Sequence, residues 1–120
     1  MREIKFRAWN GHHKHMLFVG DFTIYYEPDN GFHSGDCSNN GDWVNFQLMQ
    51  YTGLKDKNGV DIYEGDIVNL LDINIEITFS NGSFQMISSK SQGRSPAIQE
   101  RLKRYTVIGN IHQNPELLNR

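Results

Sequence analysis

The chain has 120 residues, a length that favours one domain and argues against a catalytic domain with a separate accessory domain. Its net charge of −2 gives no bulk electrostatic reason for a polyanionic partner, and its single cysteine, Cys37, excludes an intramolecular disulfide and is typical of a reducing compartment. No apolar run approaches a membrane span and no signal-peptide pattern follows Met1, so we expect a cytoplasmic protein.

The N-terminal part of the chain is predicted to form short β-strands. Residues 3–9 alternate charged and apolar side chains with the two-residue period of a half-buried strand, and the following Asn10-Gly11 favours a turn. Three later runs are rich in β-branched and aromatic residues and predict further strands: residues 15–20, 22–27 and 43–50. Between the last two, residues 28–42 are rich in glycine, asparagine and aspartate and predict a long loop. We expect Trp9 and Trp43 in the core.

A dense series of turn residues then fills the stretch Leu48–Leu70. Asn58-Gly59 predicts a tight turn, and Gly65-Asp66 predicts the corner at which the chain enters a buried strand, residues 67–70. Gly65 permits a positive φ, and the Asp66 carboxylate can accept backbone N–H bonds that fix the corner. We interpret this stretch, called the joint below, as the connection between the N-terminal and C-terminal parts, with turn residues that set the course of the backbone.

The C-terminal part is predicted to continue the sheet. Residues 73–79 alternate apolar and polar side chains, and Asn81-Gly82 between two β-rich runs is the strongest hairpin signal of the chain. A polar loop over 88–95 precedes two turns of helix over 96–104, with Pro96 at the first position and Ile98 and Leu102 on one face. The last predicted elements are a strand over 105–111 and a short helical turn over 114–118.

Three blocks of sequence resemble the YopX family of small phage and prophage proteins: REIKFRAWN, LMQYTGLKDKNGVDIYEGDIV and VIGNIHQNPELL. They cover about a third of the chain, in the expected order. The chain departs from the family pattern at Asn10, where an acidic residue is usual, and at His112, where an aromatic one is usual. The resemblance implies a compact β protein of bacterial phage genomes, with no catalytic residues to transfer.

The resulting fold prediction is one mainly β domain over residues 1–120. An N-terminal β-hairpin unit (about 1–50) is joined to a small SH3-like β-barrel part (about 51–120), with one or two short helices. We expect the side chains of the joint to face solvent and to contribute least to packing. Any binding residues are therefore predicted to lie there. The predicted binding residues are Tyr51, Lys55, Asp56, Tyr63, Glu64 and Asp66.

Neither catalysis nor a metal site is predicted. No paired-carboxylate, Ser–His–Asp or Cys–His pattern is recognisable from spacing, and we expect no enzyme activity and no cofactor. The group His12, His13 and His15 lacks the spacing of four ligands that a structural zinc site needs, and exposed loop histidines explain it better.

Two binding hypotheses remain. The favoured one is a non-enzymatic interaction module that acts in a phage or prophage, with an unknown protein or a second copy of itself as partner. The alternative is a weak nucleic-acid-binding small barrel, which would use the basic residues Arg94, Arg101, Lys103 and Arg104. The acidic pI of about 6.2 argues against that alternative.

Overall fold

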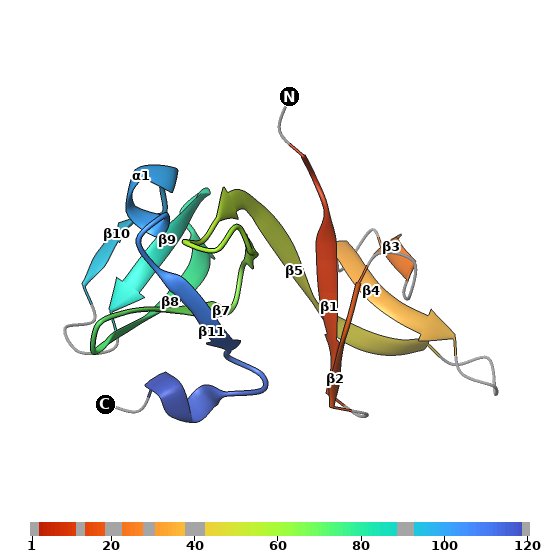
Figure 1. Cartoon of the computed structure of the whole chain (residues 1–120). Coiled ribbons are helices and arrows are strands. Elements are labelled where there is room, and N and C mark those ends of the chain that lie inside the picture. Colours follow the sequence, from red (N-terminus) through yellow and green to blue (C-terminus); the bar gives the residue numbers. More distant parts are fainter. Residues whose placement is uncertain are drawn as a thin grey trace. The chain divides into compact units, whose positions relative to one another are not determined.

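The computed structural model describes residues 3–11, 14–18, 23–27, 31–37, 43–88 and 93–118, with the backbone alone described for 23–27, 31–37 and 43–45. As predicted, the protein is mainly β and its described strands form two antiparallel sheets (Figure 1). The chain divides into two compact units. One is Lys5–Gln50, and the other is Tyr51–Arg120 together with Met1–Ile4.

The N-terminal unit consists of strands paired in the order β2-β1-β5-β4-β3. Their bounds are β1 Phe6–Asn10, β2 His15–Leu17, β3 Thr23–Glu27, β4 Gly31–Cys37 and β5 Trp43–Lys55. The predicted first hairpin is confirmed: Ala8 pairs with Leu17, and the Lys14 N–H donates to the Asn10 carbonyl at 2.8 Å. Trp9 is buried, as expected, whereas the side chain of Trp43 lies outside the described residues.

The predicted long loop over residues 28–42 is wrong in its middle. Gly31–Cys37 forms the strand β4, which pairs with β3 on one side and with β5 on the other. Two ladders of backbone hydrogen bonds outweigh the low strand propensity of its glycines, because propensity is a weak prior against pairing. Residues 28–30 and 38–42 lie outside the described residues.

The C-terminal unit is built on a curled half-barrel sheet with the strand order β10-β9-β8-β7-β11. The elements are β6 Asp61–Tyr63, β7 Asp66–Leu70, β8 Ile73–Ser80, β9 Ser83–Ser88, β10 Arg94–Pro96, α1 Gln99–Leu102, β11 Thr106–Asn110 and the 3-10 turn η1 Pro115–Leu118. β6 pairs with the end of β5, from Tyr51 to Lys55. The joint therefore lies in the C-terminal unit from Tyr51 onward.

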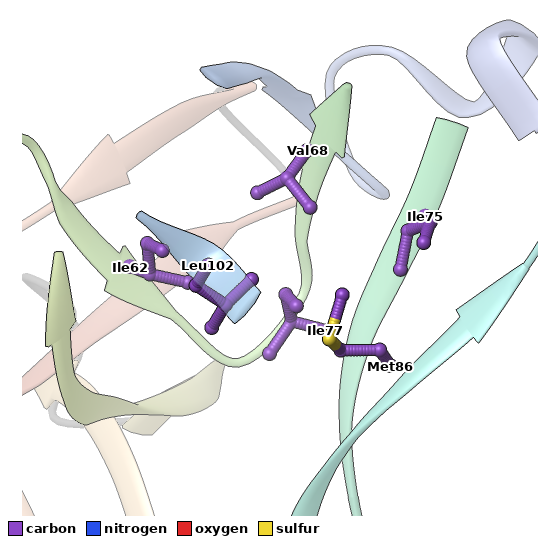
Figure 2. Packing of buried hydrophobic residues seen from close by; sticks show 6 residues of the cluster. All are labelled: Ile62, Val68, Ile75, Ile77, Met86 and Leu102. Carbon is purple, nitrogen blue, oxygen red and sulfur yellow. The ribbon is translucent and has the colours of Figure 1, made fainter. Parts of the chain in front are cut away.

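The core of this unit follows from the predicted alternation of β8. Ile75 and Ile77 point inward with Met86, which lies opposite Ile77 on β9. Figure 2 shows these side chains directed into the same space as three others, Ile62 of β6, Val68 of β7 and Leu102 of α1. All six are at most 7% exposed, so one apolar cluster ties two strands of the joint, β6 and β7, to the sheet and the helix.

The predicted hairpin at Asn81-Gly82 is confirmed. Ser80 pairs with Ser83, and the two loop residues have φ values of 53° and 82°. Positive φ at both central residues matches the twist of the flanking strands, which is why Asn-Gly is favoured there.

The predicted helix over 96–104 is too long. Pro96 belongs to the edge strand β10, and the helix is the single turn Gln99–Leu102. An edge strand tolerates a proline because one side of it needs no N–H donor. Ile98 and Leu102 were predicted on one helix face, but Ile98 precedes the helix in extended backbone and is 45% exposed, whereas Leu102 is fully buried.

The short C-terminal turn is confirmed as η1. Asn114 holds it to β11, since its N–H donates to the Asn110 carbonyl and its side-chain oxygen accepts from the Asn110 N–H. No helix among the described residues has the length and hydropathy needed to cross a bilayer.

Candidate functional site

The six predicted binding residues gather in two adjacent features of the joint. Tyr51, Lys55 and Asp56 lie at the end of β5 and in the turn after it, and Tyr63, Glu64 and Asp66 form the corner between β6 and β7. Their hydrogen bonds show what these residues do.

The Asp56 carboxylate holds the turn and connects it to a distant strand. Its Oδ1 accepts the N–H groups of Asn58 and Val60 at 2.8 and 2.9 Å, and its Oδ2 accepts the N–H of Val107 in β11 at 2.9 Å. Asp56 is 5% exposed. A buried carboxylate that accepts three backbone donors stabilises strongly, because hydrogen bonds to a charged group are worth more than neutral ones. We call this arrangement the Asp56 clasp.

The Asp66 carboxylate fixes the second feature, as predicted. Its Oδ2 accepts the Tyr63 N–H at 2.8 Å, and the residue is 2% exposed. Gly65 has φ 89°, its N–H donates to the Ile77 carbonyl and its own carbonyl accepts from the Ile111 N–H. The corner is therefore bonded to β8 and to the segment after β11.

The two tyrosines and Lys55 pack beside each other. The rings of Tyr51 and Tyr63 lie 5.5 Å apart with a tilt of 47°, and Lys55 Nζ lies 5.8 Å from the centre of the Tyr51 ring. Lys55 forms a salt bridge with Asp61 across the β5–β6 pair. The hydrogen bond from its ammonium group to Asp61 raises the pKa of Lys55 above its ordinary value of 10.5.

Gln99 adds a contact that the sequence did not indicate. Its side-chain amide accepts from the Lys55 N–H at 3.0 Å and donates to the Lys55 carbonyl at 2.8 Å. The amide thereby pairs with the last residue of β5 in the way a neighbouring strand would. It connects α1 to the beginning of the joint.

The expectation that the joint side chains face solvent is wrong for four of the six residues. Tyr51, Asp56, Tyr63 and Asp66 are buried, whereas Lys55 is exposed and Glu64 is half-buried. The two buried carboxylates accept backbone hydrogen bonds. Asp56 and Asp66 thus hold the backbone of the joint in place, in agreement with the interpretation that its turn residues set the course of the chain.

The other predicted candidates are spread over the surface. Arg94, Arg101, Lys103 and Arg104 are all exposed. Arg94 donates to the Gln85 side chain, and Lys103 pairs with Glu100 at 2.9 Å, which holds the pKa of Glu100 below its ordinary value. His12 and His13 lie outside the described residues, and the described part of the chain contains no group of three potential metal ligands.

Two surface features escaped prediction. Leu71, in the two-residue loop between β7 and β8, is 86% exposed and has φ 57°. At the other end of β8, a shallow depression of about 270 Å³ lies beside the Asn81-Gly82 hairpin and is lined by Asn81, Ser83, Gln85, Arg94, Ser95 and Pro96. Leu71-Asp72 lacks the Asn-Gly pattern of a two-residue loop, so no local signal marked this turn. The depression depends on the pairing of β9 with β10, which no local pattern indicates.

The comparisons with known proteins identify the family. The family model of the YopX protein matches residues 5–119. The chain belongs to the YopX family. The predicted resemblance is thereby confirmed over nearly the whole length, well beyond the three blocks that indicated it.

Solved structures of this family have the same fold. The crystal structure of protein EF1440 from Enterococcus faecalis is 33% identical, with a TM-score of 0.69, over 99% of this chain and 100% of that one. The X-ray structure of protein yopX from Bacillus subtilis is 23% identical, with a TM-score of 0.62, over 100% of this chain and 98% of that one. The comparison with curated proteins gives no match.

Proposed function

We propose that this YopX-family chain is a non-enzymatic accessory protein of a phage or prophage, which acts in the bacterial cytoplasm by binding a protein partner. The observation that carries the proposal is Leu71, a large apolar side chain that is 86% exposed on left-handed backbone. Left-handed backbone costs a residue with a side chain about 1–2 kcal/mol, and hairpin loops normally place glycine, asparagine or aspartate there.

A leucine in this position weakens the fold twice, through backbone strain and through exposed apolar surface. Strain of this kind is found where the residue has a function. Ile73, the next residue but one, is 36% exposed and extends the apolar surface. The complementary partner therefore presents an apolar pocket.

The chemistry of the joint supports a role without catalysis. The buried carboxylates of Asp56 and Asp66 accept backbone N–H groups, and the hydroxyl of Thr52 donates to the Ile62 carbonyl at 2.7 Å. Groups used in this way hold loops and corners in place.

The test compares three purified proteins as bait in host lysate: the unchanged chain, Leu71→Asn and the matched control Val60→Asn. Val60 is 48% exposed in the turn after β5 and is the control for the loss of exposed apolar surface. We expect a partner that is retained by the unchanged chain and by Val60→Asn and is lost with Leu71→Asn. Identical retention by all three proteins would contradict the proposal. Light scattering of the same three proteins tests whether the partner is a second copy of the chain.

The nucleic-acid alternative depends on the exposed Arg101 and Arg104 next to the half-buried Tyr105. Phosphate contacts by such residues make binding depend on salt. Retention on heparin or DNA at low salt tests it, and elution with the flow-through would exclude it.

A further inference from the structure

The depression beside the Asn81-Gly82 hairpin, defined above by its six lining residues, has the chemistry of an anion site. The described residues that line it are one arginine, two amide residues, two serines and a proline, with no acidic residue among them. Its volume of about 270 Å³ is slightly below that of typical drug-sized pockets and suits a small polar group.

The strand register explains why these side chains meet. Ser80 pairs with Ser83, and Gln85 lies opposite Thr78 on β8 and opposite Pro96 on β10. Arg94 lies two residues before Pro96 on the same strand, so its side chain points to the same face of the sheet as Gln85. β10 thus brings the guanidinium of Arg94 beside the side chain of Gln85 on β9.

A hydrogen-bonded chain orients the arginine. Arg94 Nη1 donates to Gln85 Oε1 at 3.2 Å, while Gln85 Nε2 donates to the Ser80 carbonyl at 3.1 Å and to Ser83 Oγ at 3.4 Å. The Gln85 amide is therefore fixed at both ends. Because Ser83 Oγ accepts in this chain, its own O–H can donate elsewhere.

Several donors remain directed to a ligand. The Arg94 guanidinium has five N–H groups and uses one on Gln85, so at least one edge can form a paired contact with an oxyanion. Within the described part of the chain, the Asn81 amide makes no hydrogen bond to protein atoms. Ser95 lies opposite the buried Met86, so its side chain points to the other face of the sheet and only its backbone borders the depression. One fixed charge surrounded by neutral donors matches a tetrahedral oxyanion.

We propose that this depression binds a phosphate group, with Arg94 as the charged ligand, Ser83 and Asn81 as neutral donors, and Gln85 as the residue that positions Arg94. The site does not involve Leu71, which lies at the opposite end of β8, so the two proposals stand or fall separately. The phosphate can be free or part of a nucleotide, because the donors described contact only the oxyanion.

The experiment is an NMR titration with inorganic phosphate at constant ionic strength, followed at the backbone N–H groups of residues 81–85 and at Arg94 Nε. We expect saturable shifts with a dissociation constant on the order of millimolar, as for a ligand of five heavy atoms. Arg94→Gln is expected to weaken binding about tenfold or more, because it removes a charge-assisted contact. Arg101→Gln, which removes an exposed arginine outside the depression, and Leu71→Asn are expected to leave binding unchanged.

A second variant tests whether binding needs an Arg94 charge that no neighbouring carboxylate neutralises. Gln85→Glu places a carboxylate against Arg94 and is expected to abolish phosphate binding while the amide spectrum keeps the dispersion of the folded chain. A nucleoside monophosphate that competes with phosphate and shows the same dependence on Arg94 identifies a phosphoester source, and its failure to compete identifies free phosphate. Linear shifts without saturation, or equal losses with Arg94→Gln and Arg101→Gln, would overturn the site.

Discussion

The same dipeptide closes two turns of the C-terminal unit, and the two turns differ in what holds them. Gly59 and Gly82 have φ values of 79° and 82°, and beyond their chain neighbours no described residue comes within 4 Å of the place where a Cβ would sit on either. The turn at Asn58-Gly59 is held by the buried Asp56 clasp, which reaches 51 residues ahead to Val107. The turn at Asn81-Gly82 is held by the local pairing of Ser80 with Ser83.

The difference shows that an Asn-Gly signal indicates backbone shape and says nothing of the importance of a turn for the fold. In the first turn, the loop carries a carboxylate that accepts the Val107 N–H of β11. In the second, the loop only reverses the chain, and its neighbourhood remains open to a ligand. The substitutions below measure this contrast.

The largest effect is expected from Asp56→Ala. Removing the carboxylate leaves the N–H groups of Asn58, Val60 and Val107 without their acceptor, and we expect the free energy of unfolding to fall by about 3 kcal/mol. Asp56→Asn keeps the side-chain volume and one acceptor oxygen. Its free energy of unfolding is expected to lie between those of the unchanged chain and Asp56→Ala. Urea unfolding followed by circular dichroism measures both, and a loss under about 1 kcal/mol for the alanine variant would contradict the clasp.

The second prediction compares the two glycines. Gly59→Ala and Gly82→Ala are each expected to lower the free energy of unfolding by about 1 kcal/mol, because both positions need left-handed backbone and neither crowds a Cβ. Asparagine at either position should recover part of the loss. A much larger loss at Gly59 alone would show that the clasp requires this turn to have one conformation.

Sequence patterns indicated most of the fold, because the relevant forces act between near neighbours. The alternation Ile73–Phe79, the corner at Gly65-Asp66 and both Asn-Gly turns are local, and the structure confirms them. Long-range pairing decided the rest. β4 forms against its propensity because it has a partner on both sides, and Pro96 enters β10 because β9 is there to pair with it.

The candidate site was harder to predict for the same reason. Sequence order placed Asp56 in a turn, but the N–H of Val107 that makes its burial favourable is 51 residues away. Polar residues in a turn region therefore suggested an exposed surface where the structure has a buried clasp. The surface features, Leu71 and the depression beside the Asn81-Gly82 hairpin, became visible only with backbone angles and strand register.

A third turn gives the next prediction, because Leu71 occupies a position that Asn81 occupies in the second hairpin. Both are the first residue of a two-residue loop, with φ values of 57° and 53°. Leu71→Asn should therefore raise the free energy of unfolding by about 0.5 kcal/mol, since asparagine tolerates this backbone better. Val60→Asn is the control and should give no such gain. A loss of stability with Leu71→Asn would mean that the leucine contributes to the fold, and the argument for a binding role would fail.

The smallest effect concerns the salt bridge between Lys55 and Asp61, which pair across the strands next to the first turn. At the equivalent place beside the second turn, the paired residues are the uncharged Ser80 and Ser83. The hydrogen bond to Asp61 raises the pKa of Lys55 above 10.5, so the folded state holds this proton more tightly than the unfolded state. The stabilisation is therefore fully present below the unfolded pKa and is lost as the pH rises through the folded pKa.

The stability difference between the unchanged chain and Asp61→Asn is expected to be small at neutral pH, because Lys55 is exposed, and to disappear at alkaline pH. Thermal unfolding of both proteins across that range measures the difference, and added salt should reduce it at neutral pH. A difference that persists after Lys55 has lost its proton would show that Asp61 stabilises the turn without the charge of Lys55.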